Sequence, residues 1–153
     1  AVLIIQIPLG MYLVDMDFSE KRLTIENIHV AVGISIFYLT ILRLIYKTFN
    51  PTPNLNNSIF PGQKIIAKLN NVFLYISILM ITISGDLKKL YNGEELNMFF
   101  FNLEIQDNFE LAEIFYEIHI LGNYTLIVLI SLHIFAVLIH KILFKENLLK
   151  RIL

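Results

Sequence analysis

Three histidines of this chain lie in apolar stretches where an imidazole needs a partner. His119 and His133 are 14 residues apart in a run that has one charged residue, Lys141, between Ile118 and Phe144. Fourteen residues are close to four helical turns, so both imidazoles leave one helix face, about 21 Å apart along its axis. Neutral imidazole ligates haem iron well, and ionisable residues inside membrane spans are usually functional. The spacing therefore predicts two haem sites, one near each side of a membrane.

His29 is the predicted partner of His119. It begins another apolar run on the same side of the membrane, so the two histidines lie at the same depth. Gly33 and Gly122 each follow one of them by about one turn and leave room where a flat macrocycle must approach. We expect His29 and His119 to ligate the iron of one haem b, and His133 to ligate the iron of a second.

The second ligand of the inner haem is expected on the first helix. That helix runs outward, so the level of His133 lies roughly 14 residues before Gly10. This position is upstream of Ala1, and we expect a histidine there in the intact chain.

Basic residues near the inner side are candidates for contact with haem propionates. Arg43 follows His29 by 14 residues, so it leaves the same helix face at the inner level. Its guanidinium either pairs with a propionate carboxylate or extends to the inner lipid headgroups. Lys47 and Lys141 are further candidates.

Each of these polar residues also has a purely structural explanation. A membrane histidine such as His29 can link helices by hydrogen bonds, but the matched depths and the four-turn spacing together favour haem. His140, beside Lys141 at the inner boundary, is expected to be an interfacial histidine. Asn70 and Asn71 are either caps at a helix entry or contacts to a quinone.

Four apolar segments must position these residues, and they predict an all-α fold: one transmembrane four-helix bundle over residues 1–153. The expected spans are about 1–14, 27–47, 65–85 and 117–144. The first run covers only about 21 Å of a core about 30 Å thick, so we expect this helix to be truncated at its N-terminus. Residues 15–26 and 86–113 are expected to be loops, the latter with an interfacial apolar patch, Met98–Phe101.

Composition places the chain in the membrane class. Only 16% of its 153 residues are charged and 56% are hydrophobic, whereas soluble domains have about 25% charged residues. There is no cysteine, which excludes disulfides, thiolate metal sites, iron–sulfur clusters and c-type haem attachment. Any metal bound here must be held by nitrogen or oxygen.

The charges differ between the two sides of the expected bundle. With four spans, the first and third loops share one side, and the second loop shares the other with the C-terminus. The second side has eight of the twelve basic residues and a single acid, Glu146. The other twelve acids lie on the first side with Lys21, Arg22, Lys88 and Lys89. The positive-inside rule therefore places both termini in the cytoplasm.

Two stretches carry a family resemblance. One is Ile28-His29-Val30-Ala31-Val32-Gly33, followed by Leu42-Arg43-Leu44 and Asn50-Pro51-Thr52-Pro53. The other runs from His119-x-x-Gly122 through His133-x-x-Ala136-x-x-x-His140 to the tail at 145–153. They resemble the second helix, and the fourth helix with its tail, of the bacterial four-helix cytochrome b561 family. The third span, ending Ile83-Ser84-Gly85, also fits, so the resemblance covers essentially the whole chain.

The resemblance implies two b-type haems and electron exchange with the quinone pool, and some members oxidise superoxide and pass the electron to ubiquinone. Carried over, His29 and His119 ligate the outer haem and His133 supplies one ligand of the inner haem. The family often has two histidines at the position of His140-Lys141, and a histidine near Asn70-Asn71 that is absent here.

The sequence therefore predicts a dihaem membrane cytochrome b that exchanges electrons with quinone, as an electron carrier or as a superoxide:ubiquinone oxidoreductase. The outer loops carry charges of +4 and −12, which repels superoxide unless local cations form a funnel. The alternatives are a cytochrome b subunit of a larger respiratory or dehydrogenase complex, and a haem-free structural subunit. Expected partners are ubiquinone, membrane lipid and other respiratory-complex subunits, without nucleic acid. The expected location is the bacterial inner membrane or an equivalent energy-transducing membrane.

Overall fold

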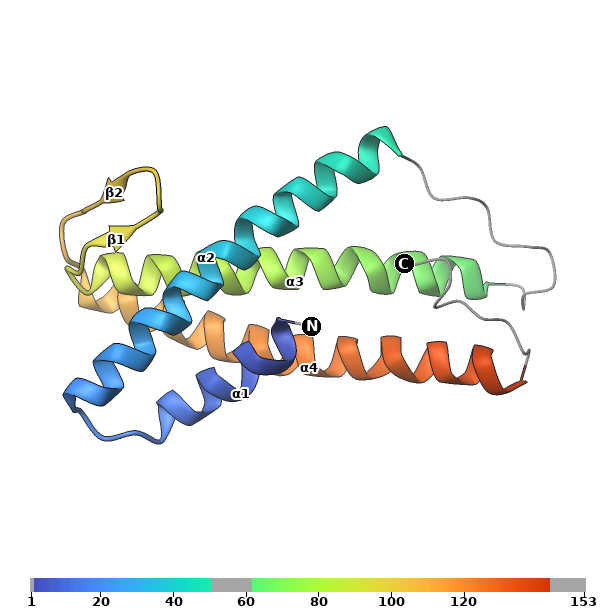
Figure 1. Cartoon of the computed structure of the whole chain (residues 1–153), viewed down its shortest axis with the longest axis horizontal. Coiled ribbons are helices and arrows are strands. Elements are labelled where there is room, and N and C mark those ends of the chain that lie inside the picture. Colours follow the sequence, from blue (N-terminus) through green and yellow to red (C-terminus); the bar gives the residue numbers. More distant parts are fainter. Residues whose placement is uncertain (1, 51–61, 144–153) are drawn as a thin grey trace.

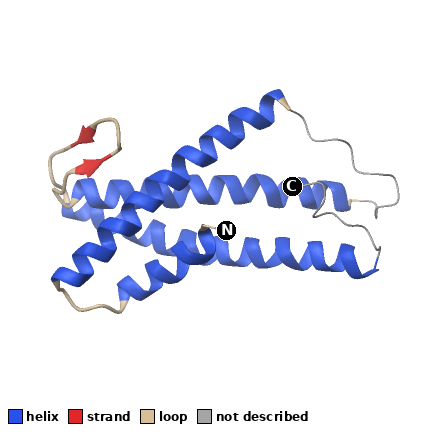
Figure 2. Cartoon of the chain, in the orientation of Figure 1, coloured by secondary structure: helices blue, strands red, loops and turns tan. Residues whose placement is uncertain are grey.

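The computed structural model describes residues 2–50 and 62–143, and these form four helices and one short hairpin. The helices are α1 (Leu3–Val14), α2 (Glu20–Phe49), α3 (Gln63–Tyr91) and α4 (Phe109–Leu143), and the strands are β1 (Leu96–Asn97) and β2 (Asn102–Leu103). The predicted four-helix architecture is confirmed, and Figure 2 shows how little of the chain is strand. In the described ranges α2, α3 and α4 are long and apolar enough to cross a membrane, whereas α1 has 12 residues.

The helices alternate in direction. The turn from α1 to α2, the end of α3, the hairpin and the start of α4 all lie at one end of the molecule, on the left in Figure 1. We call this the hairpin end. The end of α2, the start of α3 and the end of α4 lie at the opposite end. This arrangement brings the acidic segments together at the hairpin end, as the sequence predicted.

Helices α3 and α4 run side by side along most of their length, and α2 crosses them obliquely (Figure 1). Gly122 allows the close approach of α4 to α3, because a Cβ there would lie 2.7 Å from Ile81 Cγ1. Buried hydroxyls on α3 bond to carbonyls of their own helix: Thr82 Oγ1 donates to Ile78 O at 3.0 Å and Ser84 Oγ to Ile81 O at 3.0 Å. Small residues of this kind are typical of helix contacts inside membranes.

Two helix boundaries differ from the prediction because local caps outweigh polarity. Residues 15–26 were expected to be a loop, but α2 begins at Glu20, since the Ser19 hydroxyl accepts a hydrogen bond from Arg22 N at 3.2 Å. Likewise α4 begins at Phe109, well before 117, with Asn108 Oδ1 accepting from Leu111 N at 3.1 Å. Both helices therefore extend their polar first turns beyond their apolar spans.

The third helix also continues past its predicted end. Gly85 does not terminate α3, which runs to Tyr91 and is followed by Gly93 in a left-handed conformation, at φ 76°. Of Gly85 and Gly93, Gly93 alone has the backbone conformation that commonly stops a helix. The hairpin that follows was not predicted: Leu96 pairs with Leu103 and Asn97 with Asn102 in antiparallel register.

Candidate functional site

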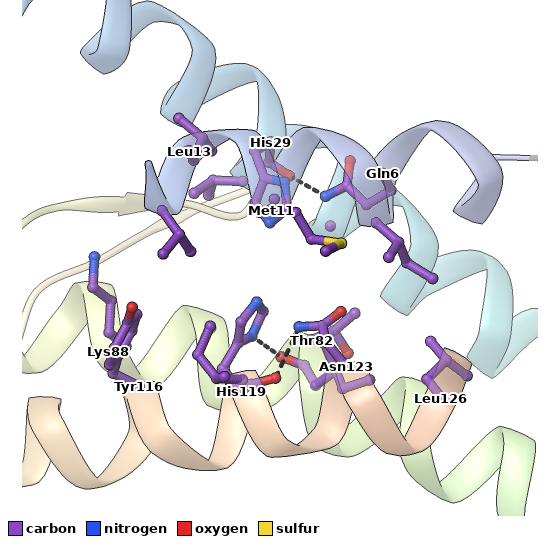
Figure 3. Close-up of a pocket in the computed structure, with 18 of the residues that line it drawn as sticks. Gln6, Met11, Leu13, His29, Thr82, Lys88, Tyr116, His119, Asn123 and Leu126 are labelled. Carbon is purple, nitrogen blue, oxygen red and sulfur yellow. Dashed lines mark hydrogen bonds between the residues drawn. The ribbon is translucent and has the colours of Figure 1, made fainter. Parts of the chain in front are cut away.

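A cavity of about 370 Å³ opens at the hairpin end and is lined by residues of all four helices. We call it the bis-histidine cavity, because His29 of α2 and His119 of α4 face each other across it (Figure 3). Their ring centroids are 6.2 Å apart and the ring planes are inclined by 72°. The structure thus brings together the two histidines that the sequence placed at equal depth.

His119 is held in one orientation by the backbone of α3. Its Nδ1 lies 2.8 Å from Ile81 O, and because a carbonyl only accepts, Nδ1 carries the proton and donates. Nε2 is then unprotonated and available as a ligand. Histidines that bind metals typically direct their other ring nitrogen at such an acceptor, which fixes tautomer and orientation.

His29 is positioned differently. Its Nδ1 is buried and has no hydrogen-bond partner within the part of the chain that the structure describes. Its backbone carbonyl accepts a 2.7 Å hydrogen bond from Nε2 of Gln6, a buried side chain of α1. Buried polar atoms usually have partners, so an exception needs an explanation. A buried ring nitrogen without a partner at the wall of the cavity is accounted for if the imidazole bonds to a group held there.

Two glycines make room for the imidazoles. A Cβ at Gly10 of α1 would lie 2.9 Å from His29 Cε1, and one at Gly85 of α3 would lie 2.9 Å from His119 Nδ1. Neither contact is possible for a real side chain. Sequence reasoning missed both roles, although an isolated glycine inside a helical pattern is a signal of close packing.

The two glycines that the sequence did select lie in different surroundings. Gly33 lines the cavity, and a Cβ there would meet only Gln6 Nε2, at 3.8 Å. Gly122 packs against α3 and does not line the cavity, so helix contact accounts for it.

The two imidazoles of His29 and His119 fit a cofactor that itself supplies the other ligands of its metal. Two imidazoles bonded to one metal at about 2 Å would hold their ring centroids roughly 6 Å apart, close to the 6.2 Å observed. Residues 2–50 and 62–143 contain no group of three or more histidine or carboxylate side chains that could hold a bare ion. A haem iron would need only these two histidines from the protein, and the largely apolar walls would suit the macrocycle.

Charged residues line the cavity toward the water side, and the basic ones are bonded to acceptors of this chain. Lys88 Nζ lies 3.2 Å from Glu26 Oε1, and Lys89 Nζ lies 2.6 Å from Glu94 Oε2. Arg22 Nη1 donates to Met16 O. Three of the four cations proposed as a funnel therefore line the cavity, each bonded to an acceptor of this chain, whereas Lys21 does not line it.

The remaining predicted site residues lie toward the opposite end. His133 Nδ1 is 3.3 Å from Asn70 Nδ2, across the contact of α4 with α3. Arg43 Nε donates to Tyr75 OH at 3.1 Å, and Lys47 Nζ lies 5.2 Å from the centroid of the same ring. The side chains of His140 and Lys141 lie outside the described part of the structure.

Comparison with known proteins identifies the family of the chain and a similar protein. The family model described as prokaryotic cytochrome b561 matches residues 1–153. The chain is also similar to cytochrome b561 homolog 2 of Escherichia coli (strain K12), with 24% identity over 149 residues that cover 95% of this chain and 79% of that protein.

Proposed function

Since this chain belongs to the prokaryotic cytochrome b561 family, and so is a haem b electron-transfer protein of a membrane, we propose that it holds two haems and exchanges electrons with the quinone pool. The observation that carries this proposal is the bis-histidine cavity, in which His29 and His119 face each other at 6.2 Å. The second haem is inferred from His133, four turns further along α4.

The residues of the cavity have distinct roles in this proposal. His29 and His119 hold the iron through Nε2, Ile81 O fixes the His119 tautomer, and Gly10 and Gly85 leave space for the two rings. A bound haem b supplies one-electron chemistry through its iron. The protein needs no nucleophile or general base of its own; it orients the ligands and keeps water away from them.

Asn70 is the proposed positioning residue for His133. The two atoms that face each other are Asn70 Nδ2 and His133 Nδ1. Rotating the amide by half a turn puts Oδ1 there instead, and the choice between the two orientations depends on the hydrogen-bond network. When Oδ1 of Asn70 accepts a hydrogen bond from Nδ1 of His133, Nε2 of His133 is unprotonated and can bind iron. Ile81 O has the same effect on Nε2 of His119.

We predict that Asn70→Leu weakens haem binding at the inner site alone. Outer-shell partners of ligating histidines typically contribute about 10- to 100-fold to affinity. A redox titration of the visible spectrum should resolve two components in the parent protein, with one reduced or shifted in the variant. The control is Asn71→Leu on the same helix. Equal effects of the two variants, or two unchanged components in Asn70→Leu, would contradict the role of Asn70.

The electron partner is proposed to be a neutral quinone. The family resemblance implies that some members also take electrons from superoxide. In this chain Lys88 and Lys89 are paired with Glu26 and Glu94, which weakens the attraction of these lysines for a small anion. A neutral quinol needs no cationic funnel and reaches the protein from the lipid.

Haem content and reduction by defined donors test the whole proposal. A pyridine-haemochrome assay on the purified full-length protein should give two b haems per chain. In proteoliposomes, ubiquinol should reduce them, and superoxide should do so more slowly. A result of one haem per chain would contradict the proposed inner site. A result of no haem would leave only the alternative of a structural membrane subunit. Two haems that only a copurifying protein can reduce would identify a subunit of a larger complex.

We further propose that the hairpin end faces away from the cytoplasm, because basic residues gather at the opposite end. The chain has no cysteine, so single cysteines report sidedness directly. Glu104→Cys at the hairpin end should react with an impermeant maleimide added outside spheroplasts. Lys68→Cys on α3 at the opposite end should react only after lysis. The reverse labelling pattern would invert the orientation.

A further inference from the structure

The hairpin β1–β2 is fixed firmly to the helices. Leu96 is 1% exposed and packs in one apolar cluster with Ile34 of α2 and Leu90 of α3. The hydroxyl of Tyr38, also on α2, donates to Met98 O at 3.2 Å. The hairpin is therefore attached to both α2 and α3.

The turn of the hairpin has a defined conformation that exposes three consecutive phenylalanines. Met98 N donates to Phe101 O at 2.9 Å, and Phe99 N donates to Asn97 Oδ1 at 2.8 Å. Phe99 has φ 69°, a conformation that bulky residues rarely adopt. The exposed fractions of Phe99, Phe100 and Phe101 are 54%, 84% and 52%. Such a cluster of exposed apolar side chains marks a surface that contacts something other than water.

The position of the turn shows what that contact is. In Figure 1 the hairpin folds back along α3, so its turn points toward the middle of the helices. The rings of Phe99 and Phe100 lie 6.4 and 6.0 Å from the ring of Tyr38. Tyr38 follows His29 by nine residues, or about 13 Å along the axis of α2, inside a helix apolar enough to span a membrane. The turn therefore packs against a part of α2 that lipid would surround in a membrane.

The hairpin becomes less polar from its base toward its turn. Glu94, Glu95 and Glu104 flank its base and are exposed, whereas the turn carries only apolar side chains. Leu39 and Leu42 continue the exposed apolar surface along α2, at 57% and 61% exposure. Exposed apolar side chains thus continue along α2 from Tyr38, the residue that contacts the turn. Aromatic residues concentrate at this level of membrane proteins.

We propose that Phe99, Phe100 and Phe101 insert into the lipid leaflet at the hairpin end and anchor the hairpin there. The partner is the membrane itself, at the boundary between headgroups and acyl chains. The hairpin packs on α2 and α3 close to residues that line the bis-histidine cavity, so this anchor sets the depth of the cavity below the membrane surface. The inference rests on the membrane location and does not depend on how many haems are bound.

A single-tryptophan variant tests the insertion, since the chain has no tryptophan. Phe100→Trp is compared with Glu104→Trp, at the acidic base of the same hairpin, in phosphatidylcholine–phosphatidylglycerol proteoliposomes of the full chain. Each variant is measured with unlabelled and with acyl-brominated lipid, and the ratio of the two emissions cancels any quenching by haem. Phe101→Trp serves as a second position in the turn.

Phe100→Trp should lose most of its emission to brominated lipid, emit at shorter wavelength and resist aqueous iodide. Glu104→Trp should show the opposite pattern. If iodide quenches both variants equally and brominated lipid quenches neither, the turn lies in water and the lipid anchor is wrong; the exposed phenylalanines would then be a surface for another protein.

Discussion

His119→Ala is expected to remove one haem per chain and leave the other. The substitution deletes one of the two imidazoles that face each other across the bis-histidine cavity and leaves the Ile81 carbonyl without its side-chain donor. An iron with one axial protein ligand in that cavity is held far more weakly. The pyridine-haemochrome assay should therefore fall from two haems to one, with the remaining haem still reducible by dithionite.

The matched set for this variant is His29→Ala, the double variant and Asn27→Ala. Both single histidine variants should give the same stoichiometry, and the double variant should lose nothing more, because both residues act at one metal and such effects are not additive. Asn27 is exposed on the same helix as His29, so its alanine variant should keep both haems. Loss of two haems in the double variant, with one lost in each single variant, would assign the histidines to different sites.

Gly85→Ala is expected to be almost as damaging, although it adds one methyl group. The new Cβ would lie 2.9 Å from His119 Nδ1 and 3.0 Å from Cε1, so the imidazole has to move. Movement breaks its hydrogen bond to Ile81 O and turns Nε2 away from His29. Elsewhere in a helix, alanine is preferred to glycine by about 1 kcal/mol. A loss of stability in Gly85→Ala would therefore come from the contact with His119 and not from helix propensity.

Haem content and thermal stability of the Gly85→Ala protein measure the two consequences separately. The outer haem should be lost or strongly shifted in potential while the helices remain inserted. Gly10→Ala, which meets His29 at 2.9 Å, should behave alike. Ala67→Val, at an exposed position of α3, is the control and should keep both haems. A Gly85→Ala protein with normal haem spectra and raised stability would show that the His119 orientation in the structure is not the one that binds haem.

The pairing of His29 with His119 was predictable because depth in a membrane follows from counting residues. Each apolar run is one helix with a fixed rise, and each histidine begins its run on the same side. Counting residues does not show which face of one helix packs against which face of another. The distance of Gly122 from His119 predicts a place beside the macrocycle, whereas Gly122 packs against Ile81 and Gly85 lies beside the imidazole.

The helix ends and the hairpin were harder to predict for other reasons. Polarity marks where lipid ends and not where a helix ends, because the caps at Ser19 and Asn108 start α2 and α4 in polar sequence. The strands have two residues each and no alternating pattern. Their position depends on burial of Leu96 and on the Tyr38 hydroxyl, contacts between residues far apart in the chain.

The walls of the bis-histidine cavity come from the first and last helices as well as the middle ones, which has a consequence for biosynthesis. During synthesis α1 and α2 enter the membrane first, joined by the hydrogen bond from Gln6 to the His29 carbonyl, and within the described residues Nδ1 of His29 has no hydrogen-bond partner. His119 follows only when α4 is inserted beside α3. We therefore expect the cofactor to bind late, once the last helix is inserted. A chain arrested after α3 would have His29 but not His119, and so could not hold the cofactor between two histidines.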